Sequence, residues 1–184
     1  MRGELNMDKE KSMALLAYHA LGTLNNSIAN NNPDERYYPF ISFDLEEAWE
    51  QLQLARECAS GKEFLDVGCG FGNIMLLAYY AGLHPHGIEY NEKLRPYTLS
   101  PLPSSAIKYM DARRYRTYGQ YDIVYLYCPI RNSKLEAQLE EQIESALKPG
   151  AIYICNIKQS THIHTSQQFR QLDKNKPIWQ KLWT

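Results

Sequence analysis

The chain has no apolar run that approaches the roughly 20 residues needed to cross a lipid bilayer. Its N-terminal sequence, MRGELNMDKEKS, also lacks the apolar stretch of a secretion signal. Its charges nearly cancel, with 20 basic and 21 acidic side chains and a formal net charge of −1. This balance argues against a strongly basic nucleic-acid binder. We therefore expect a cytoplasmic protein that has no membrane partner.

The cysteines form no recognisable pattern. Cys58, Cys69, Cys128 and Cys155 are widely spaced, with no Cys-x-x-Cys pair and no histidine cluster beside them. Disulfide frameworks and zinc sites both need closer or paired spacing. We predict neither a disulfide nor a metal site.

What the chain does have, after residue 62, is an alternation of short apolar runs with helical stretches. This alternation is typical of βαβ units and a parallel sheet. We assign residues 1–36 to an N-terminal helical arm and loop, and residues 37–184 to a single domain. The expected strands are 63–67, 86–90, 106–110, 121–127 and 151–157, followed by two short antiparallel or edge strands in the segment 167–184.

Two helices are well signalled. Ser42 or Asp44 is placed to cap a helix that runs to about residue 59. Ser133 and Glu136 fit a capping box for a helix over 133–147, which Lys148, Pro149 and Gly150 end. Leucine and isoleucine fall on one face of that second helix, and its glutamates are expected largely elsewhere. His162 and His164 are expected on a surface loop.

Residues 64–72 read FLDVGCGFG, a strand followed by glycine at every second position. A strand, a glycine turn and a helix start together offer backbone N–H groups to a ligand at the carboxyl end of a parallel sheet. Three acids stand at successive strand ends: Asp66, Glu89 and Asp111. Glu89 can accept hydrogen bonds from two ribose hydroxyls, and Asp111 can accept one from an exocyclic amine of adenine. The set predicts a nucleoside pocket.

The glycine spacing indicates which kind of nucleoside. A dinucleotide fingerprint is G-x-G-x-x-G, with the pyrophosphate on the helix N-terminus. Here the pattern is G-x-G-x-G, and Asn73 stands where the third fingerprint glycine would fall. This spacing favours a cofactor without pyrophosphate.

These residues resemble class I S-adenosylmethionine-dependent methyltransferases. Their first motif is similar to residues 66–72, their second acidic position matches Glu89, and their third motif matches Asp111-Ala112. Leu147-Lys148-Pro149-Gly150 looks like a further landmark. The resemblance implies a Rossmann-like three-layer α/β sandwich, with a seven-stranded, mostly parallel sheet whose last strand is antiparallel.

The resemblance also implies how the cofactor is held. Glu89 would hold the ribose, Asp111 and the Ala112 amide the adenine, and Asp66 with the glycine backbone the methionine portion. The cofactor would be S-adenosylmethionine, and its product S-adenosylhomocysteine. The full set of expected cofactor-binding residues is Asp66, Gly68, Cys69, Gly70, Gly72, Asn73, Glu89, Tyr90, Asp111, Ala112 and Tyr127.

The acceptor of the methyl group should be determined around YLYCPIRN, at the end of the fourth strand. Adenine and amide N-methyltransferases carry Asn or Asp and two prolines there, whereas this chain has Tyr127-Cys128-Pro129-Ile130. It also lacks a long inserted DNA-recognition domain. Tyr127, Pro129 and Tyr38 are candidate walls of the acceptor site, and no catalytic residue is assigned. A protein side chain and a small molecule both fit as acceptor.

Two other functions stay open at this point. A nicotinamide-dependent oxidoreductase is disfavoured by Asn73 and by the absence of any Tyr-x-x-x-Lys pair. The other alternative is an S-adenosylmethionine-binding protein without catalysis, since a fold does not fix function. The sequence predicts no oligomeric state.

Overall fold

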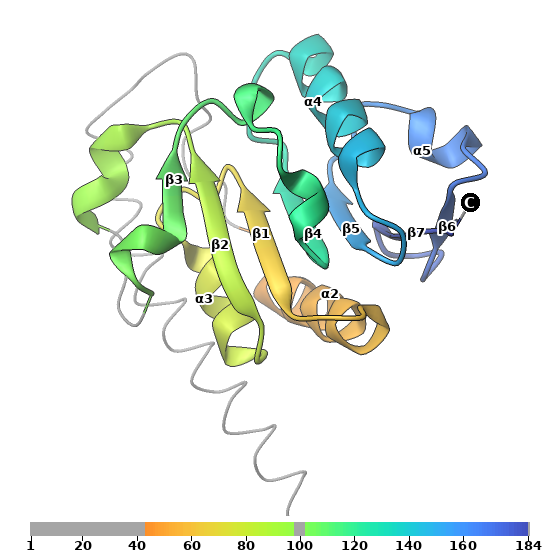
Figure 1. Ribbon diagram of the computed structural model, residues 1–184, viewed down its shortest axis with the longest axis horizontal. Helices are drawn as coiled ribbons and strands as arrows, with labels where there is room; N and C mark the ends of the chain where they lie inside the picture. Colours follow the sequence, from red (N-terminus) through yellow and green to blue (C-terminus); the bar gives the residue numbers. More distant parts are fainter. Residues whose placement is uncertain (1–42, 98–101, 184) are drawn as a thin grey trace, which may run out of the picture.

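The computed structural model describes residues 43–97 and 102–183 (Figure 1). Within these residues, seven strands form one sheet in the order β3-β2-β1-β4-β5-β7-β6. The predicted strands are all present, with ends that shift by a residue or two. Their bounds are β1 Glu63–Val67, β2 His84–Glu89, β3 Ile107–Tyr109, β4 Ile123–Tyr127, β5 Ile152–Asn156, β6 Phe169–Gln171 and β7 Ile178–Lys181.

The direction of the strands confirms the predicted topology. The pairs β1·β2, β1·β4, β2·β3 and β4·β5 are parallel. Strand β7 pairs antiparallel with both β5 and β6. The last strand is therefore the reversed one, inserted between β5 and the edge strand β6.

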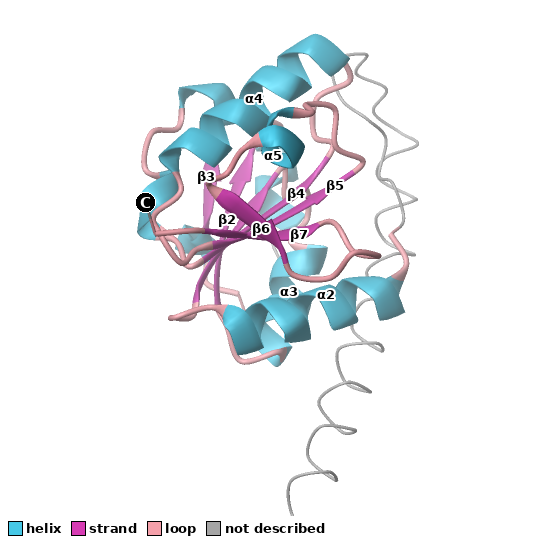
Figure 2. Ribbon diagram, turned by 90° about the vertical axis from the view of Figure 1, so that its right-hand side faces the viewer, coloured by secondary structure: helices cyan, strands magenta, loops and turns pink. Residues whose placement is uncertain are grey.

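Helices cover both faces of the sheet, which makes three layers (Figure 2). Helices α2 and α3 lie on one face, and α4 with the short α5 on the other. This is the expected Rossmann-like α/β sandwich. The helix bounds are α2 Leu45–Cys58, α3 Asn73–Tyr80, α4 Ser133–Ala146 and α5 His162–Thr165, and the 3-10 turns are η1 Glu92–Tyr97, η2 Ser104–Ala106, η3 Ala112–Arg114 and η4 Tyr118–Gln120.

Alternation along β1 divides the core between the two faces. Phe64 packs in the cluster under α2 and α3, whereas Leu65 and Val67 pack in the cluster under α4. Because both faces are covered, the central strands β1, β4 and β5 are buried nearly throughout. The chain steps from β1 outward to β2 and β3 and then returns to β4 on the other side of β1. The carboxyl ends of β1 and β4 thus flank a topological switch point, where α/β sheets bind ligands.

The first described helix begins as predicted. Asp44 caps α2, because its Oδ1 accepts a hydrogen bond of 3.1 Å from the Glu47 N–H. The alternative cap, Ser42, lies outside the described residues. So does the predicted N-terminal arm, residues 1–36.

The prediction for α4 was wrong about its N-cap, and the helix also buries glutamates. The N-cap is Asn132 rather than Ser133, since Asn132 has extended backbone and its Oδ1 accepts from the Leu135 N–H at 3.1 Å. The glutamates Glu136, Glu140 and Glu144 do not face solvent: all three are fully buried. They repeat every four residues, so they form a carboxylate stripe along the buried side of the helix beside the leucine face.

The expected loop at His162 and His164 is also corrected, because these residues form the one-turn helix α5. His162 Nδ1 lies 2.7 Å from Glu144 Oε2, so this turn is fastened to α4. The buried carboxylate stripe accounts for the turn.

Candidate cofactor site

The glycine loop after β1 has a backbone that only glycine adopts readily. Gly68, Gly70 and Gly72 have φ values of +81°, +55° and +91°. The N–H groups of Gly68 and Cys69 both donate to the Ile88 carbonyl, at 2.8 and 3.0 Å, which ties the loop to β2. Left-handed backbone costs an ordinary residue roughly 1–2 kcal/mol. The three glycines therefore permit this turn.

The same glycines differ in what surrounds them. A Cβ on Gly68 would lie 2.4 Å from the Pro129 Cβ, so Gly68 lets the loop after β4 pack directly on the loop after β1. A Cβ on Gly70 would meet no atom of the described residues within 4 Å. Gly68 is thus a packing position, and Gly70 borders open space. A ligand has room to approach the backbone at Gly70.

Glu89 ends β2 and points back to the glycine loop. Its Oε2 accepts from the Gly70 N–H at 2.8 Å, and its Oε1 accepts from the Asn91 N–H at 2.7 Å. Burial raises the pKa of this carboxyl, and the backbone hydrogen bonds from Asn91 and Gly70 oppose that rise. Each carboxylate oxygen can accept a second hydrogen bond. Glu89 therefore fixes the loop and keeps acceptor capacity for a ligand.

Asp66 lies on β1 beside Gly87 of β2 and Tyr125 of β4. Only 3% of it is exposed. Burial, and then the charge of Glu89, raise the pKa of Asp66 to about 8. The folded protein without ligand therefore favours the protonated form of this carboxyl near neutral pH.

Cys69 is a packing residue. Its thiol is buried, and burial followed by the charges of Asp66 and Glu89 raises its pKa well above the ordinary value. A Cβ on Gly87 would lie 2.6 Å from the Cys69 Sγ, so the thiol fills the space over that glycine. Because a thiolate is the reactive form, Cys69 is not a nucleophile.

The predicted adenine side is built around Asp111. Asp111 caps the turn η3, and its Oδ2 lies 2.6 Å from a terminal guanidinium nitrogen of Arg113. The Arg113 hydrogen bond holds the pKa of Asp111 below its usual value. The Ala112 carbonyl accepts from the Tyr118 hydroxyl at 2.7 Å, and Tyr90 is 47% exposed. Arg113 was not among the predicted site residues, although it is two positions from Asp111.

The remaining predicted residues divide between the loop after β4 and helix α3. The Tyr127 ring stacks edge-on against Phe43, with centroids 4.7 Å apart, and burial raises the pKa of its hydroxyl. Pro129 lies against Gly68, as described above. Gly72 caps α3, and Asn73 begins it with a buried side chain. Tyr38, the third candidate for the acceptor wall, lies outside the described residues.

Glu136 is a site-forming residue that the sequence did not reveal. Its Oε2 accepts from the Ile130 N–H at 3.0 Å, so α4 anchors the loop after β4. Burial raises the pKa of Glu136 to about 8. An amphipathic-helix pattern places a glutamate outward, and only the fold brings this one beneath residues 128–130.

Two classes of feature are absent from the part of the chain that the structure describes. None of its helices is both long and apolar enough to span a membrane. Across residues 43–97 and 102–183, no group of three or more His, Cys, Asp or Glu side chains could hold a metal ion.

Comparisons with known proteins support the fold. No protein-family model and no curated protein matched the chain. Among solved structures, an S-adenosylmethionine-dependent methyltransferase from Clostridium acetobutylicum has a TM-score of 0.50 at 12% identity, covering 76% of this chain and 56% of its own. DesVI from Streptomyces venezuelae has a TM-score of 0.49 at 20% identity, covering 60% of this chain and 49% of its own. A methyltransferase from Thiobacillus denitrificans, solved with S-adenosyl-L-homocysteine, has a TM-score of 0.46 at 20% identity, covering 59% of this chain and 47% of its own.

In each of these pairs the similar part spans about half the length of the solved protein. At these identities the likeness concerns the fold. This chain therefore shares its overall fold with the methyltransferase from Clostridium acetobutylicum.

Proposed function

We propose that the chain is an S-adenosylmethionine-dependent methyltransferase. The observation that carries this proposal is Glu89, a buried carboxylate with spare acceptor capacity beside the open space at Gly70. Ribose hydroxyls are the groups that such a carboxylate accepts from at the end of a second parallel strand. The fold comparison and the glycine spacing support the same cofactor.

The charges of the site also favour this cofactor. Asp66 and Glu89 are acids close enough for the charge of Glu89 to raise the pKa of Asp66. The methionine end of S-adenosylmethionine carries a sulfonium and an ammonium, whereas a dinucleotide brings a negatively charged pyrophosphate. The cation would lower the pKa of Asp66 and favour its charged form, whereas the charge of Glu89 would repel a pyrophosphate. A nicotinamide-dependent oxidoreductase is therefore the weaker candidate.

When bound, the cofactor supplies an electrophilic methyl group on sulfur. Such a transfer is an in-line displacement, so the protein mainly orients the reactants and excludes water. Gly70, Glu89 and Asp111 would hold the nucleoside, and the loop from Tyr127 to Ile130 would border the acceptor. We propose a small molecule or a protein side chain as that acceptor, and a cytoplasmic location.

Two measurements test the proposal. Fluorescence titrations with S-adenosylhomocysteine and with NADH compare the two cofactors, and we expect tight binding of the first only. Incubation with methyl-labelled S-adenosylmethionine and a fractionated lysate then identifies the acceptor class. Binding of NADH alone would overturn the cofactor. Measurable binding of S-adenosylhomocysteine with label in no fraction would favour a binding protein without catalysis.

We predict that Glu89→Ala weakens S-adenosylhomocysteine binding by about 10- to 150-fold. A hydrogen bond to a charged group contributes about 1.5–3 kcal/mol, which converts to this range. Asp111→Ala should weaken binding less, because Arg113 already occupies much of that carboxylate. Isothermal titration calorimetry gives both affinities.

The matched control is Glu92→Ala, which removes the same charge three positions along the chain. The Glu92 side chain is 73% exposed and pairs with Arg95 on the surface. Its replacement should leave the affinity within about twofold, because exposed ion pairs contribute little. An unchanged affinity in Glu89→Ala would place the ribose elsewhere.

A further inference from the structure

Ile157, the residue after β5, combines two unfavourable features. Its φ is +53°, in the left-handed region that a β-branched residue rarely adopts. Its side chain is also 54% exposed, which makes it one of the few large apolar residues on the described surface. Strain of this kind persists only where the surroundings impose it, and it clusters at functional positions.

Ile157 directly follows β5, so it lies at the carboxyl-terminal end of the parallel strands, the end that carries the cofactor site. Asn156 at the end of β5 pairs in register with Tyr127 at the end of β4. The residue after Tyr127, Cys128, also has left-handed backbone, with φ +44°. Pro129 then packs on Gly68 of the glycine loop. Ile157 therefore stands one strand beyond the loop that would border the methyl acceptor.

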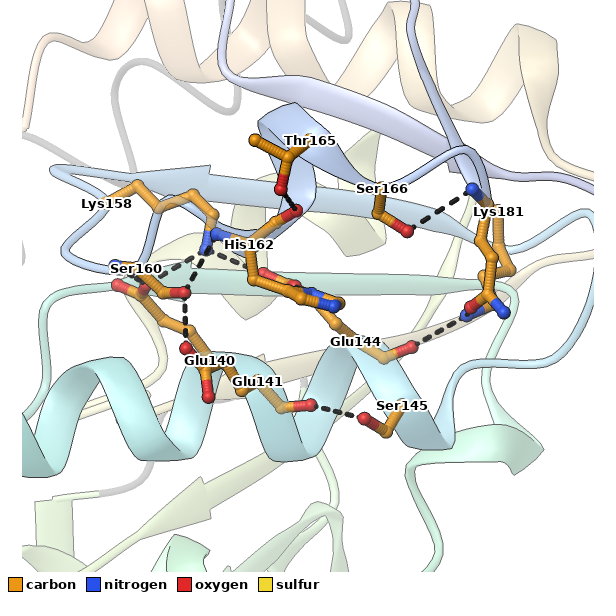
Figure 3. Close-up of polar contacts among 11 residues, drawn as sticks. Glu140, Glu141, Glu144, Ser145, Lys158, Ser160, His162, Thr165, Ser166 and Lys181 are labelled. Carbon is orange, nitrogen blue, oxygen red and sulfur yellow. Dashed lines mark hydrogen bonds and ion pairs between the residues drawn. The ribbon is translucent and has the colours of Figure 1, made fainter.

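A buried polar network fixes the backbone on both sides of Ile157. Before it, the side-chain amides of Asn156 and Gln51 exchange hydrogen bonds of 3.0 and 3.3 Å. After it, Lys158 Nζ lies 2.9 Å from Glu140 Oε2 and 2.6 Å from Glu144 Oε1 (Figure 3).

Glu140 reaches the next two residues as well. Its Oε1 accepts from the Gln159 N–H at 2.8 Å, and its Oε2 accepts from the Ser160 N–H at 2.6 Å. The Gln159 side-chain amide donates to the Ile157 carbonyl at 2.9 Å. These contacts hold the turn at Ile157 in its strained form, with an apolar side chain presented to solvent.

We propose that Ile157 is a contact residue for the methyl acceptor, and that the acceptor presents an apolar or aromatic group to it. This inference rests on the proposed function, since it assumes that methyl transfer occurs at this end of the sheet. On the neighbouring loop after β4, Pro129 and Ile130 carry no charge, so this end of the sheet suits an apolar group better than a sugar ring. Ile157 thus determines specificity, and the stripe of glutamates on α4 positions it.

The first test separates strain from packing. Ile157→Ala and Ile157→Gly both remove the apolar contact, but only glycine relieves the left-handed backbone. We expect the glycine variant to melt about 2–4 °C above the alanine variant, the shift that about 1 kcal/mol gives in a chain of this size. At positions with right-handed or extended backbone the alanine variant would be the more stable of the two, because glycine usually destabilises the folded state relative to alanine. An alanine variant as stable as the glycine variant, or more stable, would overturn the strain argument.

The second test concerns binding and uses two small probes. With saturating S-adenosylhomocysteine, benzylamine and glucosamine are titrated separately into protein carrying ¹³C-labelled isoleucine methyl groups. Benzylamine should shift the Ile157 methyl resonances, assigned by their loss in Ile157→Ala, and glucosamine should not. The resonances of Ile123, which is fully buried, should stay in place. No shift with benzylamine, or an equal shift with glucosamine, would overturn the proposal.

The third readout is methyl transfer to the labelled lysate fraction. Both Ile157 variants should bind S-adenosylhomocysteine as the wild type does but transfer at least about tenfold less label at low acceptor concentration, the loss expected when one buried apolar contact is removed. Transfer equal to that of the wild type would overturn the proposal. A wild type that transfers no label contradicts the proposed function instead, and the benzylamine titration still decides whether Ile157 binds an apolar group.

Discussion

Lys158→Ala should lower the free energy of unfolding by about 3–5 kcal/mol, the usual cost of breaking a buried ion pair by removing one partner. The Lys158 side chain is 7% exposed, and those of Glu140 and Glu144 are wholly buried. Burial opposes the charged ammonium, but the acidic groups around it, Cys155, Glu144 and Glu140, raise the pKa of Lys158 overall. Without the lysine, the carboxylates of Glu140 and Glu144 stay buried but lose the positive charge that pairs with both of them.

Lys176→Ala is the matched control for this prediction. Lys176 pairs with Glu50 at 2.6 Å, the same distance as the Lys158–Glu144 pair, but the Glu50 side chain is 59% exposed. Exposed pairs contribute about 0–1 kcal/mol. Urea unfolding of both variants measures the difference. Equal losses in the two variants would mean that burial of the α4 carboxylates does not govern the stability of this region.

The sequence predicts the sheet well because its signals are local. Each strand is a short apolar run bounded by glycine, proline or charge, and strands alternate with helices, which together define parallel βαβ units. Asp44 was found as a cap because it directly precedes a helical pattern. The residues indicated two antiparallel or edge strands in the segment 167–184, and the resemblance to a family specified that the last one is antiparallel. No local signal gives the position of β7 between β5 and β6.

The glutamates of α4 show where such reasoning fails. Helical periodicity assigns a charged residue to solvent unless a partner is known. The partner of Glu140 and Glu144 is Lys158, which follows β5 and reaches the helix only once the sheet has formed. A contact between segments this far apart in the sequence cannot be predicted from the pattern of residues within one helix or strand. The same applies to Glu136, which binds the Ile130 backbone.

The features of the candidate site likewise divide into those that the sequence predicts and those that it does not. The glycines and Glu89 were predictable, because their roles depend on position at the ends of adjacent strands. The pairing of Asp111 with Arg113 and the packing of Tyr127 on Phe43 were not, because they depend on side-chain direction. Whether these residues contact the cofactor is a prediction that binding measurements must test. Backbone strain at Ile157 was also invisible, since isoleucine in a strand pattern predicts extended φ.

Asp66 should make the protein less stable as the pH rises from about 4 to about 8. An unfolded aspartate loses its proton near pH 3.8, whereas folding raises the pKa of Asp66 to about 8 through burial and then through Glu89. Between these values the folded state holds a proton that unfolding releases, so a higher pH favours the unfolded chain. One such group lowers the free energy of unfolding by about 1.4 kcal/mol per pH unit. Above about pH 8 the carboxylate is ionised in both the folded and the unfolded state. The stability that its proton provided at low pH is then fully lost, and the free energy of unfolding no longer depends on this group's titration.

Asp66→Asn removes this proton and should flatten the dependence. Between about pH 6 and about pH 8, urea unfolding should show a loss of stability that is about 2–3 kcal/mol larger in the wild type than in the variant. Glu136, whose pKa burial also raises to about 8, accounts for a slope that remains in the variant. Asp111→Asn is the control, because the pKa of Asp111 is lowered and its linkage lies at acid pH. An undiminished slope in Asp66→Asn would show that Asp66 is ionised in the ligand-free protein, with its charge already available to the cation of the cofactor.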